Sequence, residues 1–316
     1  MTHDASLTRS PICLSGMPHL SDDELVAMFE RCSNAGRWGP DDERGTLNYI
    51  TPEKRRAAAR LVELGEVISA GRDLSTEQTI GNPRPVSHLM LYPPNGGAGS
   101  GDWFGIASHG MAVTHIDALA HLSWQDRLYN GRTASQTYTR NAVTWGSIRA
   151  QREGIFTRGV LLDVAAARGV DWVESDQFIT VGDLEAAEER ENVRVSSGDA
   201  LFVRTGLARL EAARGEQAAN PRAGLDATCA EWMHQREVAV YGGDCIEKLP
   251  YPSARMPLPL HVLALVAMGM PLLDWPALEE LQATCERLRR WEFLLATAPL
   301  RLPGGTASPI NPQCVF

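Results

Sequence analysis

The chain has 316 residues, a mass of 34.5 kDa, a formal net charge of −9 and 44% hydrophobic residues. A chain this apolar can bury a core, which excludes intrinsic disorder, and its 28 glycines and 19 prolines follow no short period, which excludes a collagen-like or low-complexity protein. The acidic balance argues against a dedicated nucleic-acid-binding protein, because such proteins normally carry a basic stripe. We therefore expect a folded protein whose partner is a small molecule.

Capping and breaking residues predict two helices near the N-terminus. Ser21 opens a capping box ahead of an apolar run, which is typical of the start of a short helix. The pair Thr51-Pro52 supplies an N-cap followed by proline at the first helical position, and Gly65 supplies a stop, so a second helix is predicted over 52–64.

Apolar runs and helical patterns along the rest of the chain indicate the α/β class, with a single mixed sheet and flanking helices. The predicted strands lie at 159–164, 200–205 and 238–241, and the predicted helices lie at 183–191 and about 277–291. No linker or internal repeat divides this pattern. We therefore expect one domain over 51–316, preceded by an N-terminal extension over 1–50.

The six cysteines are widely scattered without a C-x-x-C pair, which argues against a cysteine-type zinc site and favours reduced thiols in a cytoplasmic protein. The first residues lack the basic segment and apolar core of a signal peptide. Three prolines and His261 interrupt the most apolar stretch, 256–273, which is therefore predicted to be a buried core segment and not a membrane span. We expect no membrane partner.

A stretch rich in glycine and proline, 93–101, stands directly before three closely spaced histidines. Its composition predicts a flexible loop. The loop is either a mobile lid over a site or a solvated connection without a role, and the second is the more frequent case.

An aspartate lies among the closely spaced histidines. His109, His115, Asp117 and His121 all fall within 13 residues. In a strand, His115 and Asp117 leave the same face because their spacing is two. His121 faces the same way whether the chain becomes helical after Asp117 or the strand continues. Two imidazoles and a carboxylate suit Zn²⁺ or Mn²⁺, and such an ion lowers the pKa of bound water and polarises a carbonyl. The alternative is a set of hydrogen-bonded polar residues in a half-buried turn.

The sequence from Thr114 to His121, Thr-His-Ile-Asp-Ala-x-x-His, resembles the signature of the metal-dependent cyclase family, which includes bacterial kynurenine formamidase and isatin hydrolase. The resemblance implies a swivelling β/β/α-type fold, a divalent metal ion, either Zn or Mn, and assembly as a homodimer or homotetramer. It covers nearly the whole chain, because further segments are similar to the longer members of the family at 38–48, 159–163, 198–206 and 299–312.

Carried over position by position, the resemblance implies that His115 and Asp117 are metal ligands. It implies that His121 is the catalytic base or a ligand of a second metal ion. The first histidine of the family pattern falls at 111, where this chain has Met111. His109 lies two residues earlier and can take that place as a ligand only if the loop follows a different path.

The stretch 260–274 resembles the part of the family that supplies a distant histidine and an acidic residue, which implies that His261 and Asp274 are further metal ligands. The family commonly has glutamate at the second position, and aspartate is one methylene shorter. Without the resemblance, His261 would be interpreted as a packed histidine in an apolar helix. Asp244 and Glu247, near a predicted strand end, are weaker candidates for lining a pocket and can equally be solvated.

These residues predict a metal-dependent hydrolase that acts on an amide, lactam or related C–N bond of a small molecule, with aromatic molecules among the candidates. Two alternatives stay open. One is a cyclase or lactone-opening enzyme that uses the same metal site. The other is a non-catalytic binding protein that kept the fold and lost a complete metal site.

Overall fold

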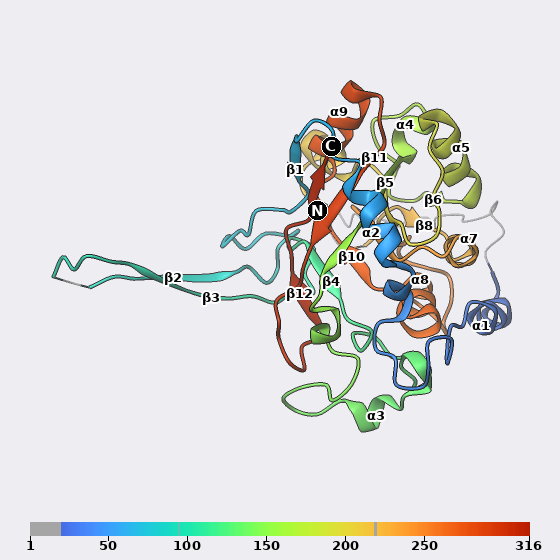
Figure 1. Cartoon of the computed structure of the whole chain (residues 1–316), viewed down its shortest axis with the longest axis horizontal. Coiled ribbons are helices and arrows are strands. Elements are labelled where there is room, and N and C mark those ends of the chain that lie inside the picture. Colours follow the sequence, from blue (N-terminus) through green and yellow to red (C-terminus); the bar gives the residue numbers. More distant parts are fainter. Residues whose placement is uncertain (1–19, 94, 218–219) are drawn as a thin grey trace, which may run out of the picture.

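A nine-stranded mixed sheet forms the centre of the fold, with helices on both of its faces (Figure 1). The computed structural model describes residues 20–93, 95–217 and 220–316. The strand order is β1-β13-β11-β5-β7-β9-β10-β4-β12. The strands are β1 Val67–Ser69, β4 His115–Asp117, β5 Ile155–Asp163, β7 Ala200–Arg204, β9 Val240–Gly243, β10 Leu272–Asp274, β11 Glu292–Thr297, β12 Ala307–Pro309 and β13 Gln313–Val315. This architecture confirms the predicted α/β class.

The four middle strands, β5, β7, β9 and β10, are parallel, and antiparallel pairs extend the sheet on both sides. Parallel strands are buried on both faces, which explains the continuous apolar runs that predicted them. In β5, Val160 and Leu162 face one apolar cluster, whereas Leu161 faces the other. The helices that pack these clusters are α1 Asp22–Arg31, η1 Gly45–Tyr49, α4 Val164–Ala167, α5 Val181–Glu191, α7 Thr228–Gln235, the π-helix η4 Val262–Met268 and α9 Glu279–Leu288.

Shorter elements complete the body of the molecule. A small parallel pair, β6 with β8, lies outside the main sheet. These elements are α2 Pro52–Ala59, η2 Tyr129–Gly131, α3 Ala134–Thr137, η3 Ile148–Gln151, β6 Phe178–Ile179, α6 Leu207–Arg214, β8 Gly224–Leu225 and α8 Pro259–His261. None of the helices within these described residues has both the length and the apolar composition needed to cross a bilayer.

The first helix confirms its predicted capping box. The Ser21 hydroxyl accepts a hydrogen bond from the backbone N–H of Glu24, and the Glu24 carboxylate accepts one from the backbone N–H of Ser21. The described part of the N-terminal extension packs against the body, because the Asn34 side chain donates to the carbonyl oxygen of Met268 and the backbone N–H of Thr46 donates to that of Gly269. Residues 1–19, including Cys13, lie outside the described residues.

The predicted end of the second helix at residue 64 is wrong, because α2 ends at Ala59. The backbone N–H groups of Leu64 and Gly65 instead donate to the carbonyl oxygen of Phe316, at 3.1 and 2.8 Å. A contact with the far end of the chain therefore takes these residues out of the helix.

The other predicted strands and helices are present at the expected positions, but some of their ends are shifted. The β7 strand and α5 match closely, and β5 begins at 155, four residues earlier than predicted. The β9 strand begins at Val240, because the backbone N–H of Val238 donates to Met233 at the end of α7. The α9 helix ends at Leu288, because Arg289 adopts a left-handed conformation with φ +53°.

A two-stranded antiparallel ribbon, β2 Ser87–Leu91 and β3 Gly101–Gly105, projects from one side of the body (Figure 1). We call residues 87–105 the arm. The described residues of the predicted loop at 93–101 form its tip, which points away from the body. In this arrangement the loop does not cover the histidine cluster of its own chain.

Candidate metal centre

The short strand β4 places His115 and Asp117 on one face of the sheet, as their spacing predicts. The β4 strand lies between β10 and β12, with His115 opposite Asp274 and Asp117 opposite Ala307. Both site side chains are fully buried. The Nδ1 atom of His115 lies 2.8 Å from the carbonyl oxygen of Val113, a contact in which the ring nitrogen is the donor. This bond leaves the Nε2 lone pair free to face Asp117, whose Oδ1 atom lies 3.6 Å away.

His109 joins the cluster from the loop that follows the arm. Its Nδ1 atom lies 3.0 Å from Oδ1 of Asp117, and its Nε2 atom lies 3.0 Å from the hydroxyl oxygen of Thr306. The guanidinium of Arg84 donates to the backbone carbonyl oxygen of His109 at 2.8 Å. Thr306 and Arg84 were not predicted as site residues. Thr306 lies far from His109 along the chain, and Arg84 lies outside the family signature.

Met111 stands at the position where the family pattern has its first histidine, but it lies outside the cluster formed by the histidines and Asp117. Its side chain packs against an apolar cluster that includes Leu207, Leu210 and Trp275. The imidazole beside Asp117 therefore comes from His109 along a different loop path. That His109 serves as a ligand remains a prediction.

His121 reaches the cluster by a route that neither sequence expectation described. The chain after Asp117 forms a turn in which the backbone N–H of His121 donates to Ala118 at 2.8 Å, so the predicted helix or continued strand is wrong. Nε2 of His121 lies 3.9 Å from Oδ2 of Asp117, and its ring stacks on that of His109 with centroids 3.8 Å and planes 15° apart. Its side chain is 24% exposed, and no hydrogen bond joins its ring to another described residue.

His261 approaches from the other side, at the end of α8 where the π-helix η4 begins. Its Nε2 atom lies 3.7 Å from Oδ2 of Asp274, the same oxygen that lies 3.8 Å from Nε2 of His115. Glu247 holds the outer face of the ring, with Oε1 2.5 Å from Nδ1 of His261 and Oε2 accepting the backbone N–H of Leu260 at 2.9 Å. Both residues implied by the 260–274 stretch thus lie beside β4.

Of the two weaker acidic candidates, Glu247 lies beside the cluster and Asp244 does not. The Asp244 carboxylate accepts hydrogen bonds from the backbone N–H groups of Thr205, Gly206 and Leu207, at the start of α6. Burial raises the pKa of Asp244, and these donors oppose the shift. Asp244 therefore caps a helix, whereas Glu247 positions a histidine.

The donor atoms fit a divalent metal ion. His109, His115 and Asp117 form one set of ligand atoms within 4.8 Å of one another, and Asp117, His121 and His261 form a second set. Neither carboxylate oxygen of the fully buried Asp117 accepts a hydrogen bond from a described residue. A buried carboxylate without donors is costly, and an ion bound between these side chains would neutralise it. Imidazole nitrogen with carboxylate oxygen is a donor set that Zn²⁺ and Mn²⁺ accept.

The charges in the cluster are strongly coupled. Burial acts to raise the pKa of Asp117, but the surrounding imidazoles, His121 first, outweigh burial and hold this pKa below its usual range. Burial lowers the pKa of His121 to about 4, against the attraction of Asp117. Burial also acts to lower the pKa of His261, but Glu247 and Asp274 raise it well above its usual value. Near pH 7, Asp117 is therefore ionised and His121 keeps a free lone pair.

A groove of about 450 Å³ opens onto His109 at the surface. We call it the His109 groove. Tyr138 and Leu302 lie on its walls, and Thr306 connects it to the cluster. Its described lining is Ser108, His109, Tyr138, Thr139, Asn141, Ala142, Val143, Leu302, Gly304, Gly305, Thr306 and Ala307, without Lys, Arg, Asp or Glu.

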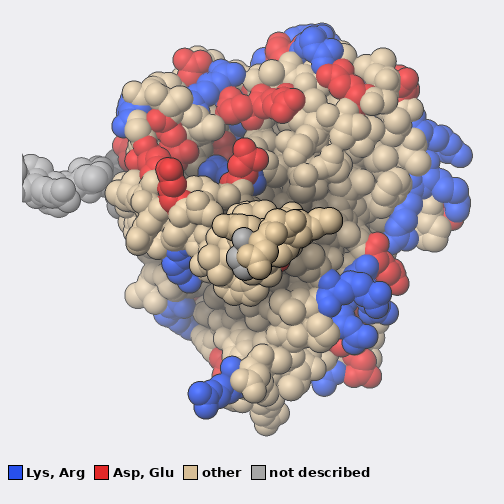
Figure 2. Space-filling view, turned by 90° about the vertical axis from the view of Figure 1, so that its left-hand side faces the viewer, with Lys and Arg blue, Asp and Glu red and all other residues tan. Residues whose placement is uncertain are grey.

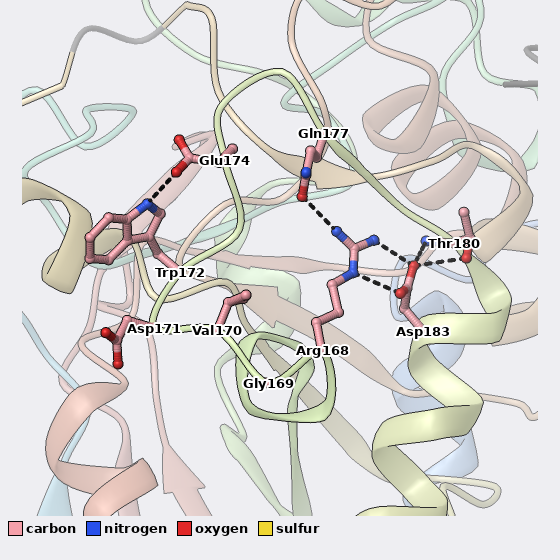
Figure 3. A pocket seen from close by; sticks show the side chains of 9 residues that line it. All are labelled: Arg168, Gly169, Val170, Asp171, Trp172, Glu174, Gln177, Thr180 and Asp183. Atoms are coloured by element: carbon pink, nitrogen blue, oxygen red, sulfur yellow. Dashed lines mark hydrogen bonds and ion pairs between the residues drawn. The ribbon is translucent and has the colours of Figure 1, made fainter. Parts of the chain in front are cut away.

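A second hollow, of about 930 Å³, lies near α4 and α5 and is lined by none of the cluster residues. Figure 3 shows its polar side chains facing one another: the Arg168 guanidinium donates to both carboxylate oxygens of Asp183 and to Gln177, and the Trp172 indole donates to Glu174. These side chains satisfy one another's hydrogen bonds, and none of the residues that line the hollow belongs to the metal cluster.

Comparisons with known proteins agree with the fold. The family model named Cyclase matches residues 53–247. The crystal structure of a novel cyclase is 30% identical with a TM-score of 0.80, covering 90% of this chain and 99% of that chain. Isatin hydrolase A from Labrenzia aggregata, bound to benzyl benzoate, is 18% identical with a TM-score of 0.58, covering 78% and 92%. Isatin hydrolase A from Ralstonia solanacearum is 21% identical with a TM-score of 0.56, covering 79% and 92%. None of the curated proteins matches the sequence. These matches confirm the predicted resemblance, and the chain belongs to the cyclase family.

Proposed function

We propose that this protein is a metal-dependent hydrolase that opens an amide, lactam or related C–N bond of a small molecule, aromatic molecules included. The observation that carries the proposal is the arrangement around Asp117. His109, His115 and His261 are each held through one ring nitrogen by Thr306, Val113 and Glu247 respectively, and each turns its other nitrogen toward the cluster. Such outer contacts fix the ring orientation that a metal ligand needs.

In this proposal His109, His115 and Asp117 hold the ion, and His261 and Asp274 contribute from the opposite side. A divalent ion bound there, Zn or Mn, would lower the pKa of a water molecule and polarise a substrate carbonyl. His121 accepts the proton that the water molecule gives up, because the His121 ring is partly exposed and is not fixed by a described hydrogen bond. A kynurenine formamidase-like or isatin hydrolase-like activity is the finer form of the same proposal.

The His109 groove supports a neutral substrate. Its lining offers apolar walls, hydroxyl groups and an amide, but no described Lys, Arg, Asp or Glu side chain. A carboxylate or phosphate substrate would find no Lys or Arg side chain in the described lining of this groove, whereas a carbonyl compound with an apolar ring can pack against Tyr138 and Leu302. The buried, unpaired cysteines of the described chain suit a reducing compartment, and we place the protein in the cytoplasm.

The proposal is tested by purifying the protein, measuring bound Zn and Mn by mass spectrometry and screening metal-loaded protein against N-formyl aromatic amides, lactams and lactones. We expect bound metal and a product that gains one water from an amide or lactam. An Asp117→Asn variant should lose both metal and turnover, which separates the reaction from contaminating activity. Turnover of lactones alone, or a product that has lost water, would favour the cyclase or lactone-opening alternative. A protein that binds no metal, even after metal is added back, would favour the non-catalytic alternative.

A further inference from the structure

The strand end that carries Asp274 is followed by a residue in an uncommon conformation. Trp275 has φ +58°, in the left-handed region, and it is buried. This region suits glycine and asparagine, and it is unfavourable for a bulky residue such as tryptophan. A residue held there needs surrounding contacts that fix it, and such residues cluster at functional sites. The contacts around Trp275 therefore bear on the candidate ligand that precedes it.

The hydroxyl group of Thr114 holds the backbone at Trp275. It donates to the carbonyl oxygen of Trp275 at 2.7 Å and accepts the backbone N–H of Arg72 at 2.9 Å. Thr114 directly precedes His115, which lies opposite Asp274 where β4 pairs with β10. Thr114 and Trp275 therefore occupy the next position of this antiparallel register, and a side-chain hydrogen bond joins them where both strands have ended. We call these two residues the clamp.

The side chain of Trp275 is fixed as well as its backbone. The indole packs in an apolar cluster that includes Leu207 and Cys245. The guanidinium carbons of Arg72 and Arg222 lie 5.7 and 4.8 Å from the centre of its ring, within the range of cation–π interactions. These contacts, together with the hydrogen bond from the clamp hydroxyl, explain how the left-handed conformation is maintained.

The carboxylate of Asp274 has few other groups to orient it. Its Oδ1 atom is buried and accepts no hydrogen bond from a described residue, and its Oδ2 atom faces the imidazoles of His115 and His261 at 3.8 and 3.7 Å. Among the described residues, no Lys or Arg forms an ion pair with Asp274. The surface around the root of the arm is also mostly neutral: in Figure 2, where the arm points at the viewer, charged side chains gather mainly toward the edges of the view. The backbone that carries Asp274 must therefore set the direction of its carboxylate.

We infer that Thr114 and Trp275 are positioning residues for the candidate metal centre. The clamp holds the chain in the left-handed conformation directly after β10, and it thereby keeps the Asp274 carboxylate beside the two imidazoles. Aspartate has a single side-chain methylene, so a shift of its backbone moves its oxygens directly. The inference rests on the proposed function, because it concerns the ion that Asp274 would help to hold.

The first test removes the clamp hydroxyl and measures metal binding. Thr114→Val keeps the shape of the side chain, but it leaves the Trp275 carbonyl oxygen and the Arg72 N–H without their partner. We expect the dissociation constant for Co²⁺, measured by competition with a chromogenic chelator, to rise about 10–100-fold. The visible absorption spectrum of the bound Co²⁺ should also change, because the position of a carboxylate ligand changes. Thr114→Ser retains the hydroxyl and should restore both the affinity and the spectrum.

The matched control for this test is Thr157→Val. Thr157 is a fully buried threonine of β5, and its hydroxyl donates to the carbonyl oxygen of Gly198 at 2.6 Å. The same group is therefore lost from the same kind of hydrogen bond, but outside the cluster of metal donors. Thermal stability should fall in both valine variants, whereas the affinity for Co²⁺ should fall only in Thr114→Val. Thermal scans verify that each variant is folded.

The second test addresses the left-handed conformation. Trp275→Asn and Trp275→Val both remove the ring and its packing, but asparagine tolerates the left-handed region and a β-branched residue does not. In Trp275→Val, metal binding must restore the conformation that valine disfavours. Co²⁺ should therefore bind Trp275→Val at least about 10-fold more weakly than Trp275→Asn. A role of the ring packing alone would lower both affinities equally.

The outcomes separate the inference from the proposed function. If the wild type binds Co²⁺ and Thr114→Val binds it equally well, or if Thr157→Val loses as much affinity, the positioning role of Thr114 is overturned and the metal centre stands. Equal affinities of the two Trp275 variants overturn the role of Trp275 in the same way. A wild type that binds neither Co²⁺ nor Zn²⁺ nor Mn²⁺ overturns the proposed metal centre, and the inference with it.

Discussion

Glu247 and His261 form a short contact, with Oε1 2.5 Å from Nδ1, while the second carboxylate oxygen accepts the backbone N–H of Leu260. A glutamine at 247 has one acceptor oxygen and cannot accept both bonds. Glu247→Gln should therefore loosen the His261 ring and weaken metal binding by roughly 10–100-fold. Competition titration with a chromogenic chelator measures the affinity. The control is His234→Gln, a histidine whose ring contacts Asn34 outside the cluster. Equal affinity in Glu247→Gln and the wild type would show that Glu247 does not position His261.

The different loop path at His109 gives a prediction that separates this chain from the family pattern. His109→Ala should weaken metal binding at least as much as the loss of an outer contact, about 10–100-fold or more. Adding Met111→His to that variant should not restore binding, because position 111 faces the apolar cluster around Trp275. Metal content after dialysis measures both variants, and Met111→Leu is the matched control. Rescue by histidine at 111 would place the ligand where the family pattern has it.

His121 should take part in proton transfer and should not contribute to metal affinity. His121→Ala is expected to keep its metal content and to lose about 10²–10⁴-fold in kcat, the usual contribution of a general base. Metal stoichiometry and single-turnover rates on the same sample distinguish the two roles. A drop in bound metal would instead identify His121 as a ligand of a second ion beside Asp117 and His261. A variant with full metal and full activity would remove His121 from the mechanism.

The buried carboxyl group of Glu191 should make the free energy of unfolding depend on pH. Its Oε1 atom accepts the backbone N–H of Asp163 at 2.9 Å, and burial raises its pKa from 4.5 to about 8. Between these values the folded chain keeps a proton that the unfolded chain has lost. The stabilisation is therefore complete below pH 4.5 and disappears as the pH rises through about 8. At about 1.4 kcal/mol per pKa unit, the decrease in the free energy of unfolding is on the order of a few kcal/mol.

Glu191→Gln should remove this pH dependence, because a neutral amide keeps the acceptor oxygen and cannot ionise. Urea unfolding at several pH values across the window measures the free energy of unfolding. Glu189→Gln, at an exposed position on the same helix, is the control and should retain the wild-type slope. A wild-type protein whose stability is flat across this range would show that Glu191 is ionised in the fold.

Local patterns predicted the parts of the fold and site that depend on neighbouring residues. The capping box at Ser21 and the two-residue spacing of His115 and Asp117 are decided within a few residues, and the structure places both as the patterns predict. The predicted end of α2 was wrong, because the true end depends on Phe316 at the other end of the chain. For the same reason Thr306 could not be predicted as the partner of His109, since no periodic pattern links positions so far apart. The family signature indicated His261 and Asp274, whereas composition alone favoured a packed histidine.

The walls of the His109 groove and the donors around Asp117 come from different kinds of structure. Most of the donors come from β4, the end of β10 and the end of α8, which are buried in the sheet and its packing. The walls come from the segments around Tyr138 and Leu302, which lie outside the sheet strands. Sequence changes in those segments can alter which molecules fit without moving the strands that carry the donors. This separation makes the groove a natural target for directed evolution toward new substrates, with His109 as the donor that such changes must leave in place.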